Sequence, residues 1–281
     1  CEIRIRGGSM DVNEESIKEE DEIYGKIAEV VHLICNNPAI YFSEADIHVL
    51  MMKSLMDINR FNPFDKKHGL SHTGCTTGVN KDGGIADKGY KTMLVHREYG
   101  NNKGIGERSD IVIFDKNDVV SISHPRDLKS EDKYLEPKYI FEFGTEKVSG
   151  RKKEKYKRHV EQDLEKLSKC KKEGRGFLVH IHRNYVMRRN PKTIKKYQNE
   201  IKKAWELWKA KDRVKMLVFF VEIGVPTRRI TSKIKMFNPY PSVNSGNWEE
   251  VSLNKIEKII KKFLKDETPD LVGIIDSVNH K

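Results

Sequence analysis

Two stretches decide the fold: SDIVIFD at Ser109–Asp115 and YIFEFGTEK at Tyr139–Lys147. Each embeds one carboxylate, Asp110 or Glu142, in an otherwise apolar run. Short apolar runs bounded by polar residues predict buried strands. A buried carboxylate costs several kcal/mol unless a cation or hydrogen bonds compensate its charge. The two acids therefore need partners.

The strand pattern predicts that the two acids share one pocket. Alternate side chains of a strand lie on the same face, so Asp110 groups with Val112, and Glu142 with Ile140 and Gly144. If the strands are neighbours, two like charges a few Å apart repel unless a cation lies between them. A divalent ion such as Mg²⁺, which uses carboxylates together with substrate phosphate, is the simplest partner. Separate ion pairs with nearby Lys or Arg side chains are the alternative.

The elements around these strands predict an α/β fold, a central mixed β-sheet flanked by helices. Phe61–Gly89 has no sustained period and predicts a long surface loop. Ser43 is a good N-cap, with Asp46 three residues on. Periodicity predicts helices over Asn13–Asn36, from Ser43 onward, and over Lys153–Lys172, Pro191–Lys211 and Ser252–Leu264, and strands over Tyr90–Tyr99, Ser109–Asp115, Asp118–Ile122, Lys138–Gly144, Gly176–His182 and Val214–Ile223.

The domain organisation follows from the same pattern. Cys1–Ser9 precedes Met10 and ends in Gly-Gly-Ser, which is typical of an added leader. We expect an N-terminal helical extension over residues 10–40, an α/β core over 41–223, and a C-terminal extension over 224–281 that packs on the core.

Composition bears on partners and location. The net charge of +11 and the pI of about 9.3 favour polyanionic partners, nucleic acid above all, although a generally lysine-rich proteome is the alternative. Four cysteines without framework spacing are typical of the reducing cytosol. No apolar run reaches the ~20 residues that span a bilayer. We expect a soluble cytoplasmic protein with no membrane partner.

The arrangement resembles the PD-(D/E)XK nuclease superfamily, which has the restriction-endonuclease-like fold. Asp110 in RSDIVIFD and Glu142 in IFEFG carry the resemblance, and it covers roughly Tyr41–Asn184. YFSEADIHVLMMKSL opens a helix with Glu44, as the first core helix of many members does with a metal-site acid. HVEQDLEKL resembles the helix beside the active strand in many uncharacterised members. The resemblance implies metal binding by Asp110, Glu142 and Glu44; a first-turn acid that complements the helix dipole is the alternative for Glu44.

One position departs from the superfamily pattern. The pattern has Lys two residues after the acid, and this chain has Gly144. That lysine helps to orient the attacking water and to stabilise charge at the phosphate. We expect the place beside Glu142 to be empty, and Lys147 or Lys166 to supply the ammonium from a neighbouring element. An ordinary surface lysine is the alternative for each of the two.

Other residues offer weaker candidates. His68, His72 and Cys75 make a three-ligand zinc hypothesis in a Gly-containing loop. His180 and His182 alternate onto one strand face, and we interpret them as ordinary sheet histidines.

Two basic runs, Arg151–His159 and Lys192–Lys203, flank the expected pocket in sequence. Beside a phosphodiester-cutting site they would follow the nucleic-acid backbone; solvated helix faces are the alternative. Tyr197, Trp205 and Trp208 fit base stacking, although the spacing of the two tryptophans is more typical of a core face.

The sequence thus predicts a nuclease that hydrolyses nucleic-acid phosphodiesters with Mg²⁺ or Mn²⁺, in restriction, repair or defence, with DNA favoured over RNA. The sequence does not decide the oligomeric state, and a homodimer is one option. The rival hypothesis is a catalytically decayed module of the same fold that binds nucleic acid or a protein without cutting, which Gly144 favours. A small-molecule enzyme on an unrelated α/β fold is the third.

Overall fold

The computed structural model of the chain describes residues 11–37, 40, 43–62, 73–79, 85–91, 93–100, 108–120, 135–145, 153–185, 198–203, 206, 214–223, 232–238 and 247–265. Among these residues, no helix combines the length and the apolar character that crossing a bilayer requires.

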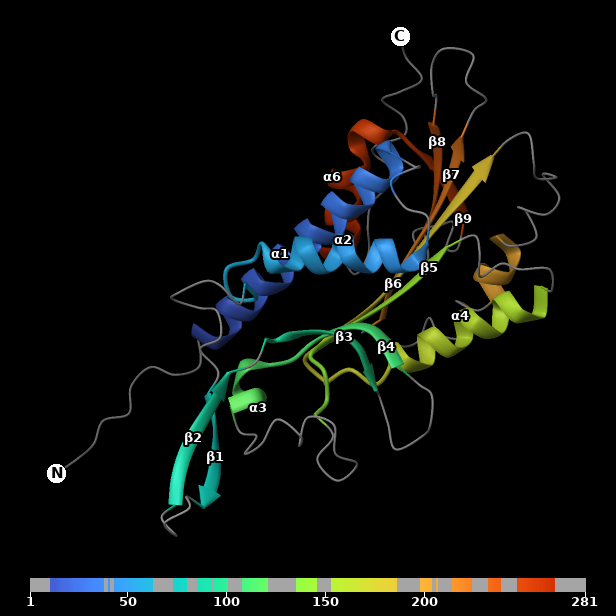
Figure 1. Cartoon of the computed structure of the whole chain (residues 1–281). Helices are drawn as coiled ribbons and strands as arrows, with labels where there is room; N and C mark the ends of the chain where they lie inside the picture. Colours follow the sequence, from blue (N-terminus) through green and yellow to red (C-terminus); the bar gives the residue numbers. More distant parts are fainter. Residues whose placement is uncertain are drawn as a thin grey trace.

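A seven-stranded mixed sheet forms the centre of the structure (Figure 1). Its strands run in chain order across the sheet: β3 (Val95–Gly100), β4 (Arg108–Ile113), β5 (Tyr139–Thr145), β6 (Arg175–Tyr185), β7 (Val214–Ile223), β8 (Ser232–Asn238) and β9 (Asn247–Val251). The pairs β5–β6 and β6–β7 are parallel, and the other neighbours are antiparallel. Parallel neighbours need a crossover connection, which α4 (Lys153–Leu167) provides between β5 and β6.

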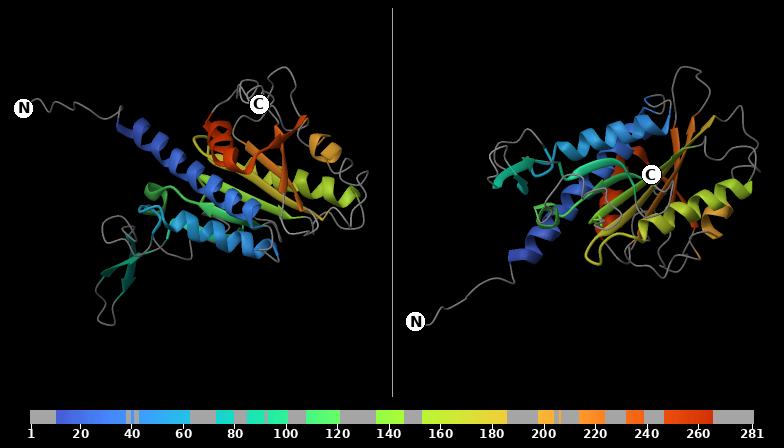
Figure 2. Two further views of the ribbon diagram at one scale, coloured as in Figure 1. Left: turned by 90° about the horizontal axis from the view of Figure 1, so that it is seen from above. Right: turned by 60° about the horizontal axis from the view of Figure 1, so that its bottom comes forward.

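Helices cover both faces of this sheet, as the sequence predicts (Figure 2). α1 (Asp11–Asn36) and α2 (Glu44–Met56) lie on one face, α4 lies on the other, and α6 (Ile256–Lys265) packs against α1 after the short 3-10 turn Leu253–Lys255. Residues 198–203 and 206 are also helical. The α/β class with a mixed, helix-flanked sheet is therefore confirmed.

The core sits between α1, α2 and the central strands. Every residue of β5 is buried, and its Phe141 stacks on Phe177 of β6 with ring centroids 4.9 Å apart. Tyr24 of α1 meets the same Phe177 edge-on. Burying each large aromatic side chain contributes about 1.5–3 kcal/mol to folding stability. These aromatic contacts therefore hold α1 against β5 and β6.

Ser43 begins α2, as expected from its capping sequence. The backbone N–H of Ser43 donates to Oδ2 of Asp46 at 2.8 Å, and the N–H of Asp46 donates to the carbonyl of Ser43 at 3.2 Å. These bonds satisfy backbone groups that a helix start leaves unpaired. They set the first turn of α2, which carries Glu44, at a fixed point beside β4 and β5.

Several local predictions are wrong. The expected loop Phe61–Gly89 contains strand β1 (Thr73–Val79), which pairs with β2 (Ile85–Lys91) in a separate antiparallel hairpin. Backbone pairing stabilises this hairpin without the apolar alternation that would reveal it in the sequence. The expected strand Tyr90–Tyr99 is divided between β2 and β3.

In the expected strand Asp118–Ile122, residues 118–120 belong instead to the short helix α3 (Lys116–Val120), and residues 121–122 lie outside the described residues. Oδ1 of Asp115 accepts a hydrogen bond from the N–H of Asn117 at 2.8 Å, and its carbonyl accepts one from Val119 at 3.2 Å. Asp115 therefore starts a helical turn in place of continuing β4.

The sheet extends past the boundary expected at residue 223. β8 and β9 continue it on the far side of β7, and the sequence analysis predicted no strand there. At the other end of the chain, Ile23, Ile27 and Ile34 of α1 are fully buried and belong to the same core.

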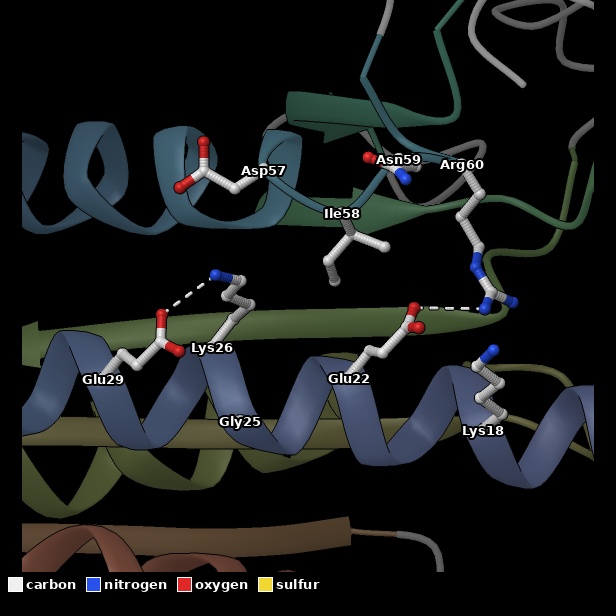
Figure 3. A pocket seen from close by; sticks show the side chains of 9 residues that line it. All are labelled: Lys18, Glu22, Gly25, Lys26, Glu29, Asp57, Ile58, Asn59 and Arg60. Carbon is white, nitrogen blue, oxygen red and sulfur yellow. Dashed lines mark hydrogen bonds and ion pairs between the residues drawn. The ribbon is translucent and has the colours of Figure 1, made fainter. Parts of the chain in front are cut away.

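A cleft of about 580 Å³ lies between α1 and the segment that follows α2 (Figure 3). Its charged side chains already compensate one another: Lys26 pairs with Glu29 at 3.0 Å, and Arg60 pairs with Glu22 at 3.1 Å. Because these charges are balanced and solvated, the cleft offers no electrostatic reason to bind an ion.

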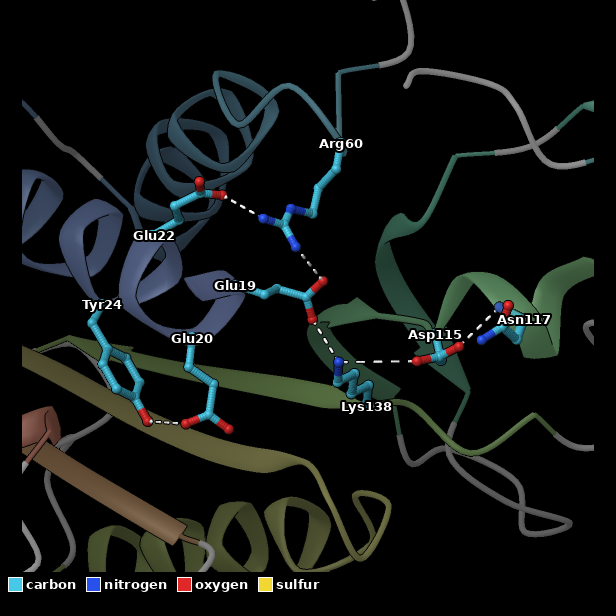
Figure 4. A network of polar contacts seen from close by, with 8 residues as sticks. All are labelled: Glu19, Glu20, Glu22, Tyr24, Arg60, Asp115, Asn117 and Lys138. Carbon is cyan, nitrogen blue, oxygen red and sulfur yellow. Dashed lines mark hydrogen bonds and ion pairs between the residues drawn. The ribbon is translucent and has the colours of Figure 1, made fainter. Parts of the chain in front are cut away.

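A polar network connects α1 to the start of β5 (Figure 4). Lys138, just before β5, donates to Glu19 at 2.7 Å and lies 3.9 Å from Asp115. Arg60 contacts the same Glu19 at 3.1 Å. The N-terminal half of α1 is thereby tied to the start of β5.

Candidate metal centre

Register places the two embedded acids side by side. β4 and β5 are antiparallel, with Val112 opposite Ile140 and Ile111 opposite Phe141. Continuing this register by one residue sets Asp110 opposite Glu142. Oδ2 of Asp110 accepts a hydrogen bond from the backbone N–H of Phe143 at 2.7 Å, which holds the Asp110 carboxylate across the end of β5.

α2 adds two further ligand-bearing side chains. Glu44 and His48 are one helical turn apart and so lie on the same face of α2. Nε2 of His48 lies 3.4 Å from Oδ2 of Asp110. One ligand atom from each of Glu44, His48 and Asp110 falls within 4.8 Å of the other two. The structure thus brings Glu44 to Asp110, as the resemblance implies.

Sequence analysis did not identify His48. Its side chain is buried, and neither ring nitrogen has a hydrogen-bond partner among the described residues. The available signal was its position four residues after Glu44 in EADIH, which places both side chains on one helix face.

Glu142 lies beside this group and is buried. One of its oxygens, Oε2, accepts a hydrogen bond from Lys166 Nζ at 2.6 Å, whereas Oε1 has no hydrogen-bond partner among the described residues. Burial raises the pKa of Glu142 well above the ordinary value, and the neighbouring charges of Asp110 and Asp163 raise it further. Without a cation these effects favour the protonated form of Glu142, and a bound cation at Oε1 would stabilise the ionised form.

Lys166 reaches the site from α4, on the far face of the sheet from α2. Its Nζ lies 2.6 Å from Glu142 and 3.2 Å from Oδ1 of Asp163, one turn earlier on α4. Burial opposes the charge of Lys166, but the two carboxylates outweigh this and raise its pKa, so the ammonium stays charged. Of the two lysines considered from the sequence, Lys166 lies at the site, and Lys147 lies outside the described residues.

The expectation of an empty place beside Gly144 is wrong. Gly144 pairs with His180 across β5 and β6, and a Cβ built on Gly144 would lie 2.5 Å from Nε2 of His180. The imidazole of His180 thus fills the space next to the strand where the superfamily pattern has its lysine side chain. Glycine at position 144 is explained by this close approach.

His180 belongs to a second cluster that sequence analysis also missed. Oδ2 of Asp163 lies 3.0 Å from Nε2 of His159 and 3.6 Å from Nε2 of His180. Burial opposes ionisation of Asp163, but the nearby His180, His159 and Lys166 together lower its pKa. Burial lowers the pKa of His159 despite the nearby Asp163. His180 is therefore more than an ordinary sheet histidine.

The charges around Glu142 do not balance. Among the residues that the structure describes, four carboxylates, those of Glu44, Asp110, Glu142 and Asp163, lie near one ammonium, that of Lys166. Burial raises the pKa of Glu44, and Asp110 raises it further. A hard divalent cation prefers carboxylate oxygens as ligands, and Oε1 of Glu142 is a buried carboxylate oxygen without a hydrogen-bond partner among the described residues. The residues present therefore fit Mg²⁺ or Mn²⁺.

The raised pKa of Glu142 predicts a pH-dependent effect on stability without metal. Because the folded-state pKa lies above the unfolded value near 4.5, ionisation of Glu142 weakens the fold as pH rises through the folded value. With a chelator present, Glu142→Gln should therefore raise Tm by a few degrees at neutral and higher pH, and the gain should vanish as pH falls toward 4.5. Thermal melts across pH measure this.

The exposed Glu165→Gln on α4 is the matched control and should show no such trend. A Tm difference for Glu142→Gln that is negative or independent of pH would contradict the electrostatic reading.

The remaining sequence candidates fall largely outside the described residues. These include His68, His72, Tyr197, Trp205, Trp208 and the first half of the basic run Lys192–Lys203, residues 192–197, while Cys75 lies in β1. The other basic run ends in α4, and its last residue, His159, belongs to the second cluster.

No protein-family model matches this chain, and neither a curated protein nor a solved structure does. What the site does must therefore be inferred from its own residues.

Proposed function

We propose that this chain is a divergent member of the PD-(D/E)XK superfamily that hydrolyses nucleic-acid phosphodiesters with Mg²⁺ or Mn²⁺. The observation that supports the proposal is that Glu44 of α2 and Asp110 of β4 offer ligand atoms within 4.8 Å of each other. Glu142 of β5 lies next to Asp110 in the strand register and contacts Lys166 of α4. The elements that carry these residues also follow the order typical of the superfamily: a helix with an acid, two acid-bearing strands, a helix and an apolar strand.

The acids would hold the metal. Asp110 and Glu44 offer oxygens within 4.8 Å of each other, and Glu142 offers its unpartnered Oε1 from the adjacent strand. His48 adds an imidazole, a ligand type that Mg²⁺ rarely uses and transition metals accept. We therefore expect Mn²⁺ to support activity at least as well as Mg²⁺. When bound, either ion would act as a Lewis acid that neutralises phosphate charge and lowers the pKa of a bound water.

Lys166 would take the role of the missing motif lysine. Its charged ammonium is held between Glu142 and Asp163, so it is oriented before substrate arrives. A fixed ammonium beside the metal-binding carboxylates stabilises negative charge as it develops at the scissile phosphate. The resemblance to the superfamily allows this lysine to come from a neighbouring element.

A binding module with a decayed site is the second candidate, and one contact favours it. Lys166 lies 2.6 Å from Glu142, so in part it already compensates the carboxylate that would otherwise bind metal. Such a protein would bind nucleic acid through its excess of basic residues without cutting it.

A cleavage assay separates the two. Duplex and single-stranded DNA and RNA are incubated with the parent chain in Mg²⁺, in Mn²⁺ and in chelator. The nuclease proposal predicts cleavage only with metal, lowered at least ~100-fold in Asp110→Asn. Asp57→Asn, at the far end of α2, should cut like the parent. A parent that binds nucleic acid but stays inert in both metals would refute the nuclease and support the module.

A further inference from the structure

We infer that His159, Asp163 and His180 form a second, separate metal site that takes a borderline divalent transition metal such as Zn²⁺. The three residues come from two elements: His159 and Asp163 lie one turn apart on α4, and His180 lies on β6. Each offers one ligand atom within 4.8 Å of the other two.

The separations of the ligand atoms fit a tetrahedral ion. Two ligand atoms about 2.0 Å from a tetrahedral Zn²⁺ are about 3.3 Å apart. The distances from Oδ2 of Asp163 to Nε2 of His159 and to Nε2 of His180, 3.0 and 3.6 Å, lie on either side of that value. Small side-chain shifts would therefore suffice to bind the ion.

The ligand set differs from that of the first site. Two imidazoles and one carboxylate suit zinc and neighbouring transition metals, whereas the oxygen-rich group around Asp110 suits Mg²⁺ or Mn²⁺. Asp163 divides its two oxygens between the sites: Oδ1 contacts Lys166 at 3.2 Å, and Oδ2 faces the two histidines. The second site is thus adjacent to the first, and its ligands are the two imidazoles and Oδ2 of Asp163.

The surroundings of His180 hold its ring in place. His180 and Asp163 are buried, and the glycine at position 144 leaves room for the imidazole against the backbone of β5. The rings of His159 and His180 stack with centroids 5.9 Å apart, so their nitrogens approach the carboxylate together. Three protein ligands would leave the fourth position of a tetrahedral ion for water.

A metal ion bound by the three residues would connect α4 to β6. An ion that binds the folded chain and not the unfolded one stabilises it by mass action. We therefore expect metal to raise Tm as well as to bind, and neither readout requires nuclease activity.

The test is a Co²⁺ titration of the full chain in millimolar Mg²⁺, followed by visible absorption. Cobalt bound by histidines in a four-coordinate site has strong visible bands, and Zn²⁺ should displace it. The parent should show these bands and a Zn²⁺-dependent rise in Tm; His159→Asn should lose both. His159 is chosen because its side chain is 30% exposed, so the variant should fold, which circular dichroism checks.

Two controls make the result specific. His32→Asn removes a histidine of similar exposure, 35%, that also pairs with a carboxylate, that of Glu257, on a remote part of the fold. Asp110→Asn removes a ligand of the first site only. Both should keep the cobalt bands. Absent bands in the parent, or equal bands in the parent and His159→Asn, would overturn the inference.

Discussion

Replacing Lys166 with alanine is expected to lower the rate of Mg²⁺-dependent cleavage by at least ~100-fold, the scale typical of a positioned catalytic group. The reason is its position: its ammonium contacts Glu142 at 2.6 Å and Asp163 at 3.2 Å. The variant loses the only lysine that the structure, in the part it describes, places on the Glu142 carboxylate. Initial rates on a labelled oligonucleotide at saturating metal measure the effect.

Lys172→Ala is the matched control, because Lys172 is an exposed lysine shortly after the end of α4. It should cut at the parent rate. Lys166→Arg keeps the charge but changes its shape, and we expect an intermediate rate. Cleavage by Lys166→Ala at the parent rate, with metal binding unchanged, would show that Lys166 has no catalytic role.

The second large effect concerns stability. Gly144→Ala should lower the free energy of unfolding by about 1–3 kcal/mol, the usual cost of overpacking a core. The added Cβ would meet three atoms of the buried His180 ring at 2.5–2.7 Å, closer than any real contact allows. For the same reason, Gly144→Lys should fail to restore a motif lysine. Urea unfolding of the metal-free proteins measures the change.

Gly25→Ala provides the control, since a Cβ there meets only the end of the Lys261 side chain, at 3.9 Å. That substitution should be neutral or slightly stabilising in the helix. In the double variant Gly144→Ala/His180→Ala the clash is gone, so the two single costs should not add. Full additivity, or a Gly144→Ala protein as stable as the parent, would contradict the close approach of His180.

The fold was most predictable where a run of apolar residues indicates a buried strand. Val214–Ile223 is apolar except for Lys215 and Glu222, and β7 has the same bounds. The hairpin of β1 and β2 was missed because TGCTTGV and IADKGYK show no apolar alternation. Asp115 looked like the end of a strand and begins α3, because its carboxylate accepts a backbone hydrogen bond that the sequence does not reveal.

The site was predictable only in part, for a similar reason. Asp110 and Glu142 were identifiable because each is an acid in an apolar run, and an unpaired buried charge is costly. His159 and Asp163 are four residues apart on α4, which places them on one helix face, but nothing in the local sequence indicates that His180 of β6 meets them. Their contact depends on how α4 packs across β5 and β6.

The most direct test of the central claim, that the carboxylates around Glu142 bind a divalent cation, is a calorimetric titration with Mn²⁺. It is made in the His159→Asn background, so that the second cluster does not contribute. We predict one saturable binding event, abolished by Asp110→Asn and by Glu142→Gln, and retained in Asp57→Asn. Mn²⁺ binding that is unchanged in both Asp110→Asn and Glu142→Gln, or absent from the background protein, would contradict the account.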